Sequence, residues 1–261
     1  MKRTILNQTQ LNLLEQVLAA TGPVVTFEQI ADLLPGMTVA GKRQFVYRLV
    51  QAGWLVRIKK GLYQVADLSS LGTLTLSRYA VAQLLVPESY VSFESALQYH
   101  GLYDQLQRAT QSVALKQHAT VELEAYAYIY VKTKQEAFYG WEEQAIDGQV
   151  IKMATPEKAL IDLIQLHRTA YSTDVVREKL ADYQATLDWP RLYTYLARTN
   201  LTTQRIFGWL LDSLHVDSTP LQALVQHSPM VSKLTAHSTT YDPKWRLYYE
   251  PTLLQNAYLE P

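Results

Sequence analysis

The feature that most constrains the fold is a change of hydrophobic period at Gly53. Before it, apolar residues recur at helical spacing through residues 38–52, with Thr38 as the predicted N-cap and Gly53 in the left-handed C-terminal position. After it, residues 54–59 alternate with period two, and residues 62–65 return as a second strand beyond the turn Lys59-Lys60-Gly61. A helix followed directly by a short basic hairpin indicates a winged helix-turn-helix, with the hairpin as its wing.

Two more helices are predicted upstream of this unit. Residues 9–20 carry leucine and valine at helical spacing, and Gly22-Pro23 stops that helix. Thr26 and Gln29 have the spacing of a capping box and open a short helix that ends at Pro35-Gly36. Three short helices and a hairpin define a predicted winged helix-turn-helix domain over residues 1–68.

The polar side of the helix at residues 38–52 predicts contact with double-stranded DNA. It presents arginine, glutamine and tyrosine opposite the apolar side. Arginine can pair with guanine and glutamine with adenine, whereas lysine and tyrosine suit phosphate, and the basic turn would reach backbone phosphate or a minor groove. A winged helix used only for protein contacts is the alternative. The predicted DNA-binding residues are Lys42, Arg43, Gln44, Tyr47, Arg48, Gln51, Arg57, Lys59 and Lys60.

The distribution of charge favours the same interpretation. The whole chain has 24 basic and 24 acidic residues, but residues 1–66 hold eight bases, including Lys2 and Arg3, and only three acids. The excess of five positive charges in this segment is balanced by the remainder of the chain. Such a separation is typical of a segment that meets a polyanion, although chance is the simpler alternative.

Several classes of site are missing from the sequence. The chain has no cysteine, which excludes disulfides, thiolate metal sites and cysteine nucleophiles. No Gly-rich phosphate loop, His-Glu-x-x-His or Gly-x-Ser-x-Gly occurs, and Glu157 and Asp162 are five apart on a predicted helix, so they do not share one face. We expect no catalytic residue, cofactor or metal, and therefore no enzyme. The histidines are not paired at ligand spacing: His100, His118, His167, His215, His227 and His237.

The chain also has no apolar stretch approaching the roughly 18 residues of a membrane span, and its first ten residues lack the apolar run of a signal peptide. We expect a soluble cytoplasmic protein without membrane contact.

Residues 69–261 are predicted to form a larger α+β domain with a small sheet and a helical C-terminal part, in which residues 175–261 can form a sublobe. Ser92 can cap a helix that ends at Gly101, and Thr155 with Pro156 opens another. Further helices are predicted late in residues 67–86 and over 175–214, with a break near Trp189-Pro190.

Strand signals lie between and after these helices. Residues 111–131 are predicted strands that place Tyr126, Tyr128 and Tyr130 on one face, either in the core, which we favour, or on a contact surface. Asp147-Gly148 is a strong hairpin signal, and the aromatic tail at residues 241–250 is predicted to be extended.

Three segments, in order and spacing, resemble the AbiEi-type antitoxins of type IV toxin–antitoxin systems. They are residues 49–63 at the wing, Tyr90 to Leu102, and Thr155 to Asp162, and the resemblance covers residues 8–170. It implies a bacterial or mobile-element protein that represses its own operon by binding inverted repeats. It also implies that the C-terminal region counters a nucleotidyltransferase toxin, typically without a stable complex. The alternative is a stand-alone transcriptional regulator whose large domain senses a ligand or oligomerises.

Overall fold

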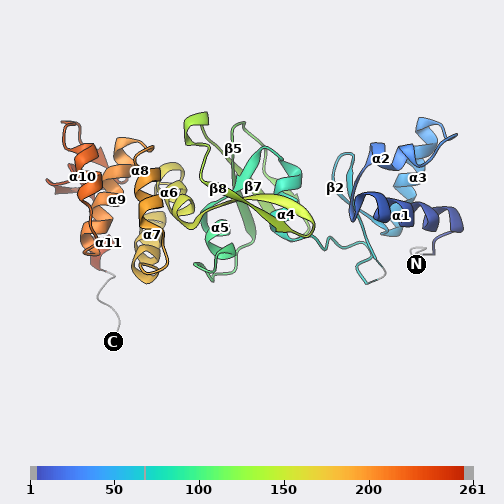
Figure 1. The fold of residues 1–261 in the computed structure, drawn as a ribbon, viewed down its shortest axis with the longest axis horizontal. Coiled ribbons are helices and arrows are strands. Elements are labelled where there is room, and N and C mark those ends of the chain that lie inside the picture. Colours follow the sequence, from blue (N-terminus) through green and yellow to red (C-terminus); the bar gives the residue numbers. More distant parts are fainter. Residues whose placement is uncertain (1–4, 68, 256–261) are drawn as a thin grey trace. The chain divides into compact units, whose positions relative to one another are not determined.

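A computed structural model describes residues 5–67 and 69–255 (Figure 1). Lys2 and Arg3, which contribute to the predicted basic excess, lie outside the described residues, as does Leu68 at the predicted domain boundary. The chain forms two compact units. The first comprises Met1–Pro87 with Glu122–Tyr126 and Ala145–Val150, and the second comprises Glu88–Val121, Ala127–Gln144 and Ile151–Pro261. The predicted α+β class, with an N-terminal group of helices and a small sheet before a larger domain, is confirmed.

The first unit begins with three helices and a small sheet, and we keep the name wing for its hairpin at residues 55–65. Its elements are α1 (Gln8–Thr21), β1 (Val24–Thr26), α2 (Phe27–Asp32), α3 (Val39–Ala52), β2 (Leu55–Lys59) and β3 (Leu62–Val65). The three strands form an antiparallel sheet in the order β1-β3-β2. Apolar residues of all three helices pack on this sheet, with Leu14, Ile30, Leu49 and Leu55 in the core. A fourth helix, α4 (Arg78–Leu85), follows later in the same unit.

Local signals set the ends of these helices. Asn7 and Thr26 both form capping boxes, at the starts of α1 and α2. The Thr38 side chain accepts a hydrogen bond from the Gly41 backbone N–H at 3.1 Å, and Gly53 ends α3 with φ of 86°. The predicted start and end of α3 are therefore confirmed, because both depend on residues within one helical turn of the terminus.

Two features of the small sheet were not predicted. β1, between α1 and α2, pairs with β3, so the wing is supported by a third strand. The pairing of β2 with β3 shifts between Arg57 and Lys59, which marks a bulge at Ile58. Ile58 is buried, Arg57 is exposed and Lys59 is half-buried, so the bulge directs the two basic side chains to different surroundings.

The larger sheet of the chain is a mixed six-stranded sheet in the order β6-β7-β5-β4-β9-β8, and most of its residues belong to the second unit. Tyr128 and Tyr130 of β7 are buried, whereas Tyr126 is 39% exposed. The predicted core role is therefore confirmed for Tyr128 and Tyr130. Asp147 and Gly148 both have positive φ and form the predicted hairpin turn. The strands are β4 (Ser89–Val91), β5 (Ala109–Ala114), β6 (Val121–Leu123), β7 (Tyr126–Lys132), β8 (Trp141–Ile146) and β9 (Gln149–Ala154).

Helices dominate the chain beyond this sheet, and Figure 1 shows α7 to α11 gathered at the C-terminal end of the second unit. The predicted break lies at residues 183–188, and Pro190 belongs to the first turn of α8, where its missing N–H is tolerated. No helix in residues 5–67 and 69–255 is both long and apolar enough to cross a membrane. The elements are α5 (Phe93–Tyr99), η1 (Gln135–Ala137), α6 (Pro156–Leu166), α7 (Ala170–Asp182), α8 (Trp189–Leu196), α9 (Leu201–Ser213), α10 (Thr219–Val225), β10 (Ser232–Lys233), β11 (Thr240–Asp242), β12 (Leu247–Tyr249) and α11 (Thr252–Gln255).

A buried ion pair lies within α6, and hydroxyl groups of Tyr90 and Ser92 link it to the end of β4. Lys158 Nζ lies 2.6 Å from Asp162 Oδ1, and both side chains are at most 1% exposed. The Tyr90 and Ser92 hydroxyls donate to Asp162 Oδ2 at 2.9 and 2.7 Å. Ser92 precedes α5 as predicted, but its side chain forms no cap hydrogen bond because it is committed to Asp162.

Candidate nucleic-acid interface

One side of α3 is exposed and polar along its length. Val46 and Leu49 face the core, at 3% and 0% exposure. Gln44, Tyr47, Arg48 and Gln51, spaced as one helical stripe, and the adjacent Arg43 are exposed; Tyr47 is 56% exposed although it is a large aromatic residue. The structure therefore brings five of the predicted DNA-binding residues together on one surface of one helix.

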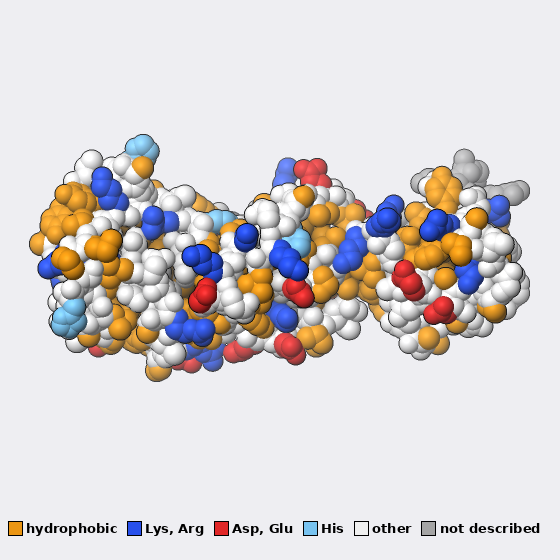
Figure 2. Space-filling model, turned by 90° about the horizontal axis from the view of Figure 1, so that it is seen from above, with side chains coloured by type: hydrophobic (Ala, Val, Ile, Leu, Met, Phe, Trp, Pro, Cys, Tyr) orange, Lys and Arg blue, Asp and Glu red, His pale blue; other side chains and the backbone are white. Residues whose placement is uncertain are grey.

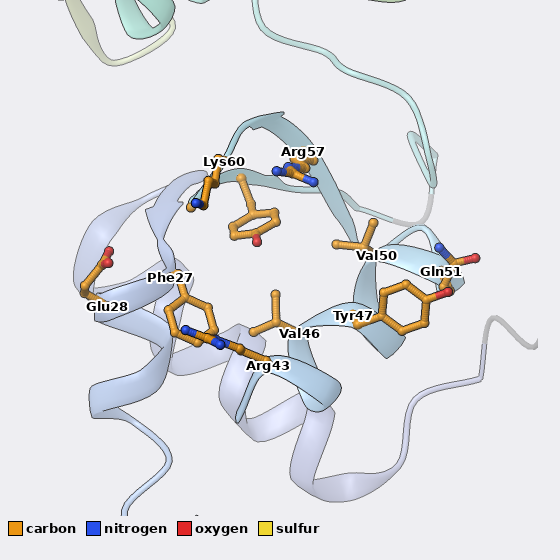
Figure 3. Close-up of a pocket in the computed structure, with 11 residues that line it drawn as sticks. Phe27, Glu28, Arg43, Val46, Tyr47, Val50, Gln51, Arg57 and Lys60 are labelled. Carbon is orange, nitrogen blue, oxygen red and sulfur yellow. The ribbon is translucent and has the colours of Figure 1, made fainter. Parts of the chain in front are cut away.

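The wing adds two more exposed cations. Arg57 lies on β2, and Lys60 is at the tip of the hairpin next to Gly61, whose φ of 78° the tight turn requires. An open pocket of about 690 Å³ separates the wing from α3. Figure 3 shows Arg57 and Lys60 on one side of this pocket and Arg43, Val46 and Tyr47 on the other. The wing and α3 thus enclose a groove whose rim is basic.

A second open pocket, of about 590 Å³, borders α3 on another side. Ile5, Leu6 and Asn7, Gln10 of α1, and the C-terminal half of α3 line it. Tyr47 and Gln51 line both pockets, so this half of α3 forms a ridge between two hollows. A protruding helix with a hollow on either side can enter a groove of a duplex while the flanking strands occupy the hollows.

Two predicted residues are engaged elsewhere. Lys42 is half-buried, and its ammonium donates to the Ala31 carbonyl at 2.5 Å, which ties the start of α3 to the end of α2. Lys59 is also half-buried; its ammonium donates to the carbonyls of Leu84 and Leu85 at the end of α4, at 2.6 and 3.1 Å. Burial lowers the pKa of Lys59. Neither ammonium points freely into solvent.

The other four predicted DNA-binding cations have no acidic side chain to neutralise their charge in the described part of the chain. Within the described part of the chain, Arg43, Arg48, Arg57 and Lys60 form no ion pair with a carboxylate. Glu28 is the one acidic residue among those that line the larger pocket. A surface with several cations and a single nearby acid creates a positive potential that attracts polyanions.

The sequence did not single out every residue of this surface. Phe27, at the start of α2, and Tyr63, on β3, also line the larger pocket. Both are half-buried aromatic residues, which a sequence pattern assigns to the core. Tyr63 lies opposite Arg57 in the hairpin, so the pairing register, once known, identifies it.

Comparison with known proteins adds two findings. Residues 12–66 match the model of a family described as transcriptional regulator, AbiEi antitoxin. No curated protein matches the chain. In fold, the chain is similar to the crystal structure of the RV2827C protein from Mycobacterium tuberculosis, with a TM-score of 0.67 over 97% of this chain and 95% of that chain, and with 17% sequence identity. The matched family segment contains α2, α3 and the wing, and it confirms the predicted resemblance of this chain to AbiEi-type antitoxins and transcriptional regulators.

Proposed function

We propose that this protein is the antitoxin of a type IV toxin–antitoxin system and that it represses its own operon. In this proposal α3 and the wing bind double-stranded DNA at an inverted repeat upstream of that operon, and the second unit counters a nucleotidyltransferase toxin. The observation that carries the DNA-binding part is the exposed stripe of arginine, glutamine and tyrosine on α3, which has no acidic partner in residues 5–67 and 69–255 and is flanked by two open pockets. The matched regulator family supports it.

The geometry suggests a division of roles. A helix about 10–12 Å across fits a major groove about 12 Å wide. Gln44 and Arg48 belong to the exposed stripe and are proposed to read base edges, while Arg57 and Lys60 on the wing are proposed to contact phosphates. An inverted repeat would bind two copies of the chain, with half-sites about 34 Å or a multiple apart.

The direct test is a gel shift with the upstream DNA of the gene against scrambled DNA at two salt concentrations. We expect specific, salt-sensitive binding. Replacement of Gln44 or Arg48 by alanine should weaken binding and relax the sequence preference. Lys116→Gln, which removes an exposed charge in the second unit, serves as the control and should bind like the wild type. Absence of binding at low salt would identify the winged helix as a protein-docking module instead.

The antitoxin part needs a separate test. The protein is co-expressed from an inducible promoter with the neighbouring nucleotidyltransferase, and growth rescue is expected. An Arg48→Ala/Arg57→Ala variant should lose DNA binding but keep the rescue, because both changes lie in the first unit. Loss of rescue in that variant would argue against neutralisation by the second unit. If the wild type binds DNA but rescues nothing, a stand-alone regulator is the better interpretation.

We also propose that the second unit acts in the cytoplasm by binding, without a catalytic residue, cofactor or metal. A turnover that one acidic or histidine substitution abolishes in a folded variant would overturn this part of the proposal.

A further inference from the structure

Two arginines in the C-terminal part of the second unit share one acceptor. Arg205 of α9 is 0% exposed, and its Nη1 and Nη2 donate to Ser232 Oγ and the Ser228 carbonyl at 3.2 and 3.1 Å. Arg246, in the turn before β12, donates from Nη1 to the same Ser228 carbonyl at 2.6 Å. In the described residues neither arginine forms an ion pair with a carboxylate.

This arrangement is energetically unfavourable as it stands. A buried charge without a counter-ion is costly, and here a second positive charge lies beside it. Burial first, and then the charge of Arg246, lower the pKa of the Arg205 guanidinium. Arg205 Nε is buried and has no hydrogen-bond partner in the described part of the chain. Two adjacent positive charges without a counter-ion are the kind of defect that a bound anion removes.

The nearby acidic side chains are already engaged. Asp212 pairs with Lys244 and accepts from the Trp245 indole N–H at 2.7 Å. Asp242 accepts from the Trp245 backbone N–H at 2.9 Å. Glu250 accepts from the Thr235 hydroxyl. The counter-charge for the arginine pair is therefore not supplied by these neighbours.

An aromatic surface lies on a third sheet, of three strands in the order β10-β12-β11, and Arg246 directly precedes β12. Tyr241 and Tyr248 are direct cross-strand partners, with ring centroids 5.0 Å apart, and Tyr241 is 42% exposed. Lys233 pairs with Tyr248 from the other side, and its ammonium lies 5.4 Å from that ring. These three side chains share one face of the sheet. In the view of Figure 2, the C-terminal part carries exposed hydrophobic side chains with Lys and Arg between them.

We propose that this surface binds a nucleotide, with its phosphate on Arg246, beside the buried charge of Arg205, and its base on Tyr241. A phosphate monoester with two negative charges matches two guanidiniums, which one carboxylate would not. The half-buried Arg246 contacts the phosphate, since only one of its five N–H donors is used by Ser228. The buried Arg205 fixes the loop through its hydrogen bonds to Ser228 and Ser232, and it supplies the second positive charge near the phosphate. The exposed Tyr241 ring offers a face for stacking, to which any base can bind.

Isothermal titration calorimetry on the full chain tests this proposal. Adenosine monophosphate, adenosine and inorganic phosphate are titrated separately at fixed ionic strength. We expect saturable binding of the monophosphate. Arg246→Gln should weaken the binding of the monophosphate about tenfold or more, because a charge-assisted hydrogen bond is lost. Lys116→Gln removes the same charge from an exposed site elsewhere in the unit and should leave the affinity unchanged.

Tyr241→Leu is the second variant, and its exposed position makes a folding failure unexpected. It should weaken the nucleotide about tenfold through lost stacking and leave inorganic phosphate unaffected. The proposal is overturned if the wild type shows no saturable binding of the monophosphate, or if Lys116→Gln weakens it as much as Arg246→Gln. It is equally overturned if adenosine or inorganic phosphate alone binds as tightly as the nucleotide. No DNA enters the assay, so the result is independent of the proposed regulator function.

Discussion

Two adjacent lysines of the wing are expected to contribute differently to DNA binding. Lys60 is exposed at the tip of the hairpin, whereas the Lys59 ammonium donates to the carbonyls of Leu84 and Leu85. Lys60→Gln should therefore remove a phosphate contact, and Lys59→Gln should not. The two variants make the same chemical change at neighbouring positions, so each serves as the control for the other.

The expected size follows from counterion release. Arg43, Arg57 and Lys60 are the exposed cations of α3 and the wing other than Arg48, which is assigned to base edges. If each of the three neutralises one phosphate, log K falls with log salt at a slope of about −2.7 per bound copy, which is about a 40-fold loss of affinity between about 50 and 200 mM salt. Lys60→Gln should reduce the slope to about −1.8 and the loss to about 12-fold. Lys59→Gln should leave the slope at about −2.7.

Fluorescence anisotropy with a labelled operator duplex, repeated over this range of salt, measures both slopes. A second series on scrambled DNA should show the same difference, because phosphate contacts carry no sequence information. The reasoning is refuted if Lys59→Gln flattens the slope as much as Lys60→Gln, since the Lys59 ammonium would then contact phosphate despite its bonds to α4. An unchanged slope in Lys60→Gln would remove the wing tip from the interface.

Four other substitutions have defined outcomes. Arg48→Ala should cost about 1–3 kcal/mol of discrimination at one base pair, measured by binding to operators mutated one position at a time; a uniform loss on all operators would make Arg48 a phosphate contact. Asp162→Ala should lower the free energy of unfolding by about 3–5 kcal/mol in urea, because it leaves the Lys158 ammonium buried without its partner. Asp182→Ala removes an exposed carboxylate and leaves Lys179 paired with Glu178, so it should cost below about 1 kcal/mol; equal effects of the two substitutions would contradict the importance of burial. Gly208→Ala should destabilise by about 1–3 kcal/mol or more, since a methyl group there would overlap the Trp245 ring; an unchanged melting temperature would show that the ring can move aside.

The sequence by itself determined the elements whose signals are local. Thr38 and Gly53 define the ends of α3, and the alternation after Gly53 defines the wing. The polar stripe on α3 was also predictable, because helical spacing alone places Gln44 and Arg48 on one side of the helix. These properties depend on residues within a few positions of one another, so no tertiary contact is needed to infer them.

The tertiary structure decided how each charged side chain is used. In the sequence, nothing separates Lys42 and Lys59 from Lys60. In the structure, the Lys42 ammonium donates to a backbone carbonyl of α2, and the Lys59 ammonium donates to one of α4. Arg205 and Arg246 are 41 positions apart, and only the packing of α9 against the sheet of β10, β12 and β11 brings them to one carbonyl. The spacing of residues in a sequence indicates which face of a helix or strand they share. The partner of a side chain depends instead on which elements pack together. Burial of apolar residues over the whole unit determines that packing.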